Sequence, residues 1–151
     1  MIAERNPRPA IAAALTLGIG LGGFFDGIVF HQILQIHNML SGWIPVTDLV
    51  TAKLNMVWDG LFHAAVWAIS LFGVALLWRA ARRPEVDFAF RNLVGGFLMG
   101  WGLFNTVEGV IDHHLLGVHH VYERLGQSAW DYAFLAWGVG MLLAGWWTVR
   151  R

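Results

Sequence analysis

The chain has 151 residues, of which 57% are hydrophobic and only 13% are charged. Soluble domains usually carry about a quarter charged residues, so this composition excludes an ordinary soluble domain and is typical of an integral membrane protein. The formal net charge is zero, which gives no general basic field for nucleic acid. The absence of cysteine excludes disulfides, thiolate metal sites and iron–sulfur clusters.

Four apolar stretches follow one another along the chain, at residues of about 10–30, 56–78, 88–111 and 129–149. Each is close to the ~20 residues that a helix needs to cross a bilayer, where backbone groups must be satisfied within the helix itself. We therefore expect an all-α integral membrane protein, with four transmembrane helices packed as a four-helix bundle in a single membrane domain over residues 1–151. The first stretch is interpreted as a span rather than a signal peptide, because it contains Asp26.

The basic residues are distributed unevenly between the two ends of these helices. Arginines flank the first stretch, the connection between the second and third, and the C-terminus, whereas only Lys53 and Arg124 fall at the opposite ends. Cytoplasmic segments are enriched in Lys and Arg. The sequence thus predicts that both termini are cytoplasmic and that loops 38–55 and 115–128 face the periplasm or exterior. We expect a multi-pass protein of a bacterial inner membrane.

The two halves of the chain resemble each other. Residues 18–39 read GIGLGGFFDGIVFHQILQIHNM and residues 100–121 read GWGLFNTVEGVIDHHLLGVHHV, so that glycines, histidines and an acidic residue recur at an offset of 82. Trp-Asp also begins the second helix of each half. Because each half contributes two helices, both halves enter the membrane in the same direction. We predict a tandem parallel 2+2 repeat, with repeat 1 over about 10–78 and repeat 2 over about 88–149.

Histidines and acidic residues gather at one end of the predicted helices. In this topology, all seven histidines and one carboxylate per helix lie at or near the outer boundary of the membrane. Ionisable groups inside a membrane are costly, and a metal cation that both residue types can bind offsets that cost. The sequence predicts one shared site for one or two metal ions. The expected ligands are Asp26, His31, His37, Asp59, His63, Glu108, His113 and His119.

The spacing of these residues suggests how they converge. Asp59 and His63 are four residues apart and would share one helix face as a chelating pair. His31 and His37 are six residues apart, which fits one site only if the helix ends or bends between them. The counterpart of His63 in the second half is Leu135, so we expect an asymmetric centre.

Further polar residues are expected beside the ligands. Asn105 lies one turn before Glu108 and is placed to hydrogen-bond to it, and Asp112 is expected to be solvated. Asp131 starts the fourth helix, where an aspartate often caps the helix instead of binding metal. The residues that we expect around the site are Asn105, Asp112, His114, His120 and Asp131.

Nitrogen and oxygen ligands without cysteine fit copper(II), zinc or non-haem iron. An outward-facing site favours copper, which also stands highest in the affinity order. The leading hypothesis is a membrane-embedded copper protein that serves redox chemistry or metal handling for respiratory enzymes. Its expected partners are the lipid bilayer and either a second copy of the chain or a respiratory complex, but not nucleic acid. The alternatives are a proton or metal-ion transporter, a zinc or di-iron enzyme, and a haem-binding protein.

Three stretches carry a resemblance to known proteins: GFFDGIVFHQILQIHNML, WDGLFHA and NTVEGVIDHHLLGVHHV. They are similar to those of a bacterial family of small four-helix membrane proteins, known as a domain of unknown function. The resemblance extends over nearly the whole chain, from about Gly18 to Gly145. It implies a membrane location and brings no activity with it.

Overall fold

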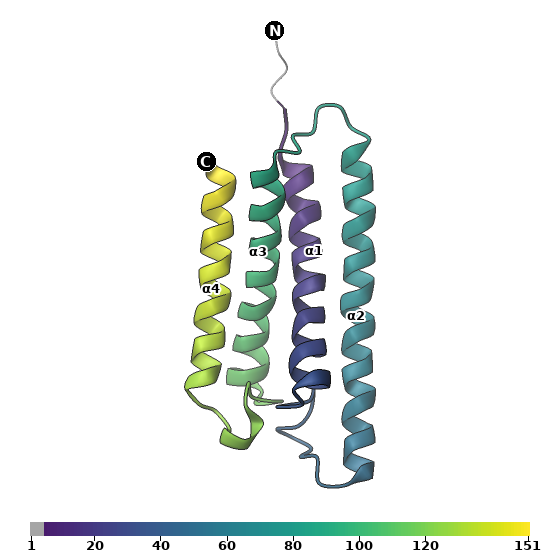
Figure 1. Cartoon of the computed structure of the whole chain (residues 1–151), viewed down its shortest axis with the longest axis vertical. Coiled ribbons are helices and arrows are strands. Elements are labelled where there is room, and N and C mark those ends of the chain that lie inside the picture. The colour runs from purple at the N-terminus through teal and green to yellow at the C-terminus, as the bar shows by residue number, and fades with distance from the viewer. Residues whose placement is uncertain (1–4) are drawn as a thin grey trace.

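The computed structural model describes residues 5–151, which form four long helices (Figure 1). Helix α1 spans Arg8–Asp26, α2 spans Leu49–Ala81, α3 spans Phe90–Glu108 and α4 spans Ala129–Arg150. Two π-helical segments, η1 (Gly27–Ile33) and η2 (Gly109–Leu115), continue α1 and α3, and a short 3-10 turn, η3, covers Glu123–Leu125. All four helices are long and apolar enough to cross a membrane, which confirms the predicted all-helical class.

Helix α2 begins well before the apolar stretch that predicted it. It starts at Leu49 rather than near Met56, because Asp48 caps its first turn. The Asp48 carboxylate accepts hydrogen bonds from the backbone N–H groups of Val50 and Thr51, at 2.8 and 2.9 Å. The Thr51 hydroxyl completes a capping box. A hydropathy pattern misses this extension, since the first turns of the helix are too polar to resemble a membrane span.

Helices α1 and α3 both change into π-helix at the same end of the molecule. Each π segment has seven residues, and the two begin at Gly27 and Gly109, which are 82 positions apart. Helical structure ends at Ile33 in the first case, so the expected interruption between His31 and His37 is present. Segments of π-helix are rare and occur often at functional sites. Here each π segment is followed by a loop, and the first of these loops begins shortly after His31.

The four helices lie side by side in a row, in the order α2, α1, α3, α4 (Figure 1). Helix α1 packs against α3, α2 covers α1, and α4 covers α3. Within residues 5–151 the backbones of α2 and α4 do not approach each other, so the helices do not close into the expected four-helix bundle. Glycines allow the central contact: a Cβ at Gly18 would overlap the Phe97 carbonyl, and one at Gly100 the Leu15 carbonyl.

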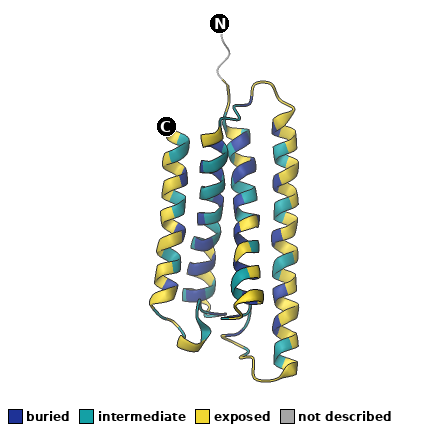
Figure 2. Ribbon diagram, viewed as in Figure 1, coloured by how far each residue is buried: buried dark blue, intermediate teal, exposed yellow. Residues whose placement is uncertain are grey.

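Large apolar side chains cover the outside of this row, and the buried positions hold small or polar residues (Figure 2). Exposed residues include Trp67, Trp78 and Trp147, whereas the buried alanines and glycines line the contacts between helices. The largest fully buried side chains are all polar: His31, His119, Asn55, Asp59 and Asp131. A lipid environment accounts for the apolar exterior. The polar interior is concentrated at the end of the row that carries the loops after η1 and η2, which we call the loop end. This end defines the candidate site.

Candidate metal centre

Six buried side chains from both pairs of helices converge at the loop end. They form three overlapping groups: His31, His37 and His119; Glu108, His113 and His119; and Asp26, His31 and Glu108. Within each group, one ligand atom per residue lies within 4.8 Å of the others. None of the six residues is more than 5% exposed. Because the groups share members, they constitute one cluster of four imidazoles and two carboxylates that is compact enough to hold a metal ion.

The change from α-helix to π-helix to loop positions these six side chains. Asp26 and Glu108 are the last residues of α1 and α3. His31 and His113 lie in the π segments that follow. His37 lies in the loop after η1, and its counterpart His119 lies in the loop after η2. A continuous α-helix would carry residues six positions apart onto different faces, so the loops are needed to turn His37 and His119 back toward the cluster.

Two of the loop histidines are held by crossed hydrogen bonds. His37 Nδ1 donates to the backbone carbonyl of Val121 at 3.0 Å, and His119 Nδ1 donates to the carbonyl of Met39 at 3.2 Å. Each loop therefore fixes the histidine of the other. With the proton on Nδ1, Nε2 keeps its lone pair, which is the arrangement typical of metal-ligating histidines.

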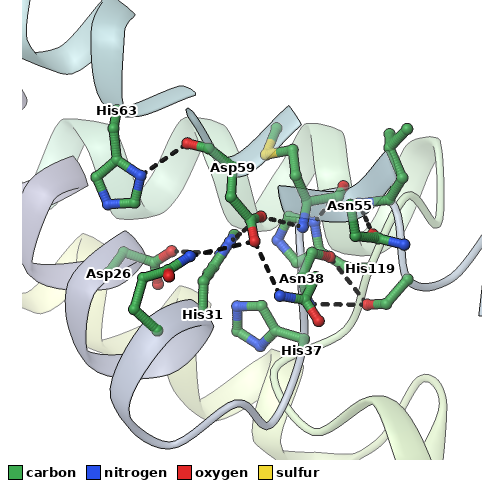
Figure 3. A network of polar contacts seen from close by, with 12 residues as sticks. Asp26, His31, His37, Asn38, Asn55, Asp59, His63 and His119 are labelled. Carbon is green, nitrogen blue, oxygen red and sulfur yellow. Dashed lines mark hydrogen bonds and ion pairs between the residues drawn. The ribbon is translucent and has the colours of Figure 1, made fainter. Parts of the chain in front are cut away.

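Asp59 orients His31 and does not belong to any of the three groups (Figure 3). Its Oδ1 lies 2.8 Å from His31 Nδ1 and accepts the backbone N–H of Met39, also at 2.8 Å. Its Oδ2 accepts the Asn38 amide at 2.8 Å. On the far side of the ring, His31 Nε2 lies 3.2 Å from Asp26 Oδ2, without the alignment of a hydrogen bond. His31 is thus held between two carboxylates.

Asp131 takes the corresponding place beside His113, with Oδ1 at 3.4 Å from His113 Nδ1. Its carboxylate also accepts the backbone N–H groups of Val121 at 3.0 Å and Ser128 at 2.8 Å. The bond to Ser128 is part of the capping box of α4. Asp131 therefore both caps α4 and faces His113.

His63 lies outside the three groups. Its Nδ1 donates to the backbone carbonyl of Asp59 at 2.7 Å, and its Nε2 lies toward Gly27 (Figure 3). The Asp59 carboxylate faces His31 instead. The structure therefore does not bring Asp59 and His63 together as a chelating pair, because the side chains leave the helix in different directions.

The other residues expected around the site lie outside the three groups. His114 Nδ1 donates to the carbonyl of Gly109 at 2.6 Å, and His120 Nδ1 lies 3.5 Å from Asp131 Oδ1. Asp112 is half-buried. Asn105 is buried, but within residues 5–151 no hydrogen bond joins its side chain to Glu108.

Sequence reasoning missed several polar residues that hold the outer loops in place. The Asn55 amide accepts the backbone N–H of Leu40 at 3.1 Å and donates to the carbonyl of Ile44 at 2.9 Å. The Ser41 hydroxyl donates to Glu123 at 2.9 Å, which ties the first outer loop to the second. Asn55 could have been found, since it lies four residues before Asp59 on the same helix face. Ser41 and Glu123 carry no such signal.

Seven buried ligand atoms of the cluster have no hydrogen-bond partner within residues 5–151: Asp26 Oδ2, His31 Nε2, His37 Nε2, Glu108 Oε2, His113 Nδ1, His113 Nε2 and His119 Nε2. Each of the six residues contributes at least one of them. A buried polar atom without a partner costs about 1–3 kcal/mol, and such atoms usually indicate an ion or an ordered water. Imidazole nitrogens and carboxylate oxygens are ligands for copper, zinc and iron. The residues present therefore fit a bound transition-metal ion.

The two loop histidines keep their lone pairs at neutral pH. Burial lowers the pKa of His37 to about 4 and that of His119 to about 3, and in each case the nearby imidazoles contribute to the shift. Neutral imidazole is the form that binds metal. Both residues are therefore ready to bind a metal ion without first losing a proton.

Comparison with known proteins gives a family and no solved relative. No curated protein and no solved structure matches the chain. A family model described as "Predicted membrane protein (DUF2243)" matches residues 13–151, which is most of the chain and includes every residue of the cluster. The four membrane-length helices agree with that description. The chain belongs to the DUF2243 family of membrane proteins.

Proposed function

We propose that this membrane protein binds one or two transition-metal ions, copper foremost, in the buried cluster of histidines and carboxylates. The observation that carries the proposal is the convergence of six buried side chains, each with at least one ligand atom that has no hydrogen-bond partner within residues 5–151. A bound cation would satisfy these atoms and offset the burial of two carboxylates. When bound, the ion would supply redox or Lewis-acid chemistry.

The residues of the chain have distinct parts in this proposal. His31, His37, His113 and His119 would ligate through nitrogen, and Asp26 and Glu108 through oxygen. Asp59 would orient His31, and the backbone carbonyls of Met39 and Val121 would orient the two loop histidines. Such outer partners fix the tautomer and the ring orientation of metal-binding histidines. The ligand set lacks cysteine, which favours copper(II), zinc or non-haem iron over copper(I).

The proposal includes a tandem repeat of two helices each, as the sequence suggests. The matched π segments and the crossed hydrogen bonds of His37 and His119 support it, since they are related by the offset of 82 that relates the sequences. The same offset relates Gln35 and Gly117, both of which have a positive φ. We propose that the metal cluster lies at the interface between the two repeats.

The proposed location is the inner membrane of a bacterium, with the cluster at the outer face and both termini in the cytoplasm. The support is the charge distribution, because Arg79, Arg82 and Arg83 lie at the end of the row opposite to the cluster. At the outer face the site would handle metal or carry out redox chemistry for respiratory enzymes. A transport pathway would need polar groups along the spans, whereas the six residues of the cluster gather at one end.

Elemental analysis of the detergent-purified protein tests the proposal. Protein incubated with copper(II), zinc or iron(II) and then desalted should retain metal at near one or two equivalents, with copper retained most tightly. His37→Gln should lose most of it. His114→Gln is the matched control, because this histidine is also bonded through Nδ1 but lies outside the three groups. A folded wild-type protein that retains none of these metals, or equal loss in both variants, would overturn the proposal.

A further inference from the structure

An aromatic cavity of about 450 Å³ lies beside the cluster, between the end of α1 and helix α4. Five aromatic residues line it: Phe30, Tyr122, Trp130, Phe134 and Trp137. Trp130 is 59% exposed and Trp137 is 65% exposed, so the cavity opens on the side of the row that faces lipid. Its size lies in the range of about 300–1,000 Å³ that is usual for small-molecule sites.

A second, smaller cavity next to the aromatic one is lined by one of the cluster carboxylates. This smaller cavity of about 70 Å³ shares Phe30, Phe134 and Trp137 with the aromatic one, and Asp26 and Asn105 line its other walls. Asp26 is 3% exposed; its Oδ2 faces His31 Nε2 at 3.2 Å, and its Oδ1 takes part in no hydrogen bond or ion pair among residues 5–151. Asn105 is equally buried, and its side chain makes no hydrogen bond within the described residues. The two spaces are therefore neighbours on either side of shared aromatic walls, and the smaller one is bounded by a buried carboxylate.

The walls of this cavity also contact the histidines of the cluster. The ring of Phe30 lies 6.0 Å from that of His37, and the ring of Phe134 lies 5.2 Å from that of His113, measured between centroids. A molecule in the cavity would therefore be separated from the metal-binding imidazoles by a single layer of side chains. In the smaller cavity, Asp26 itself forms part of the wall.

We infer that this cavity binds a membrane-soluble hydroquinone, a benzene ring with two hydroxyl groups and an apolar tail. The ring would lie among the aromatic side chains, one hydroxyl would donate to the Asp26 carboxylate, and the tail would extend into the bilayer. A carboxylate has two oxygens, so Asp26 can accept this hydrogen bond through one oxygen while the other faces His31. That the bound hydroquinone is a substrate rests on the proposed metal site, but its binding does not.

The polar side chains of Asp26 and Asn105 in the smaller cavity favour a hydroquinone over an ordinary lipid chain. An acyl chain would fill the aromatic part and leave Asp26 and Asn105 without a donor. Sites with buried polar groups strongly reject analogues that cannot hydrogen-bond to them, because those groups then stay unpaired. Aromatic side chains also favour a flat ring through offset or edge-to-face contacts.

The opposite side of the row repeats only part of this aromatic wall, because Trp58 and Phe62 match Trp130 and Phe134 but the other aromatic residues have no aromatic counterpart. The positions equivalent to Phe30 and Trp137 are Asp112 and Ala65, under the offsets of 82 and 72 that relate the two halves. The inference therefore predicts one hydroquinone per chain.

Equilibrium binding of a decyl-tailed benzohydroquinone to the purified full-length protein tests the inference, with the dimethyl ether of the same molecule as the ligand control. The wild type should bind the hydroquinone saturably, at one per chain, and the ether at least tenfold more weakly. Trp137→Ala should weaken hydroquinone binding about tenfold, whereas Trp67→Ala, an exposed tryptophan on α2, should not change it. Asp26→Leu, which removes both carboxylate oxygens, should abolish most of the difference between hydroquinone and ether.

Equal binding of hydroquinone, ether and decyl alcohol would overturn the inference and assign the cavity to lipid chains. So would an equal effect of the two tryptophan variants. Metal content is measured in the same samples, before and after treatment with a chelator. Saturable hydroquinone binding by protein that takes up no metal would contradict the proposed function alone, and metal uptake without hydroquinone binding would contradict this inference alone.

Discussion

The imidazole rings of His37 and His119 stack on each other, with centroids 4.7 Å apart and an angle of 17° between their planes. Each ring is anchored through Nδ1 to a backbone carbonyl of the opposite loop, and neither Nε2 has a hydrogen-bond partner within residues 5–151. Two stacked neutral imidazoles with free nitrogens are well suited to bind metal. They are also sensitive to any change that adds a proton to either ring.

His119 should contribute strongly to metal binding, because it belongs to two of the three groups, as His31 does, and is fully buried. We expect His119→Gln to lower metal affinity at least tenfold, as measured by competition with a chelator of known affinity. His63→Gln is the control, since His63 lies outside the groups. Equal loss in both variants would contradict the assignment of the site.

Asp59 should support the site without binding metal. Replacing it by Asn keeps the size of the side chain but removes the charge that faces His31 Nδ1. Changes to such supporting residues typically lower metal affinity by about 10–100-fold. We expect Asp59→Asn to reduce affinity in this range and to leave the number of bound ions unchanged. Asp48→Asn, a change at the cap of the same helix, should leave affinity unaffected. Loss of a bound ion in Asp59→Asn would instead make Asp59 a ligand.

The metal-free protein should become less stable as the pH falls. The folded-state pKa is lowered to about 4 for His37 and about 3 for His119, from an ordinary value of 6.5. Below about pH 6.5 the unfolded chain therefore binds protons that the folded chain excludes, and stability decreases until the folded-state pKa is reached. We expect the unfolding temperature of chelator-treated protein to fall steadily from about pH 7 to pH 5 and to change little above pH 7. His37→Gln should show a shallower dependence. An unfolding temperature that rises as the pH falls would contradict this account.

The contact between α1 and α3 should be intolerant of any side chain at Gly100. A Cβ there would overlap the Leu15 carbonyl, which belongs to backbone and cannot move aside. We expect Gly100→Ala to destabilise the protein by about 1–3 kcal/mol or to prevent folding, as measured by thermal unfolding in detergent. Gly140→Ala is the matched control, because nothing lies within 4 Å of a Cβ at that position. It should stabilise α4 by about 0.5–1 kcal/mol, since alanine is the better helix former. The prediction fails if both variants unfold alike.

Much of the cluster could be predicted from the sequence because its members recur. An acidic residue and two histidines at fixed spacing inside apolar stretches have few uses other than meeting each other, and the structure brings Asp26, His31 and Glu108 into one group. The four spans could be predicted for a similar reason, since hydropathy alone detects an apolar stretch of membrane length.

The roles of Asp59 and His63 could not be predicted, because residue spacing gives the helix face and not the direction of each side chain. The two residues share a face, yet the Asp59 carboxylate faces His31, whereas the Asp59 backbone carbonyl accepts a hydrogen bond from His63 Nδ1. The arrangement of the four helices in a row could not be predicted either. Glycine patterns show that helices can approach closely, but they do not show that α2 and α4 stay apart. The hydrogen bond between Ser41 and Glu123 joins two loops, and no periodic sequence pattern predicts the conformation of those loops.

The crossed anchoring of the two loop histidines has a consequence for assembly. Either helical hairpin, produced by itself, would hold a histidine whose carbonyl anchor is missing, together with a carbonyl whose histidine is missing. Severing the short connection between Arg83 and Asp87 would leave both outer loops intact, so co-produced hairpins could reassociate and restore the crossing. A lone hairpin would need a second copy of itself to do so.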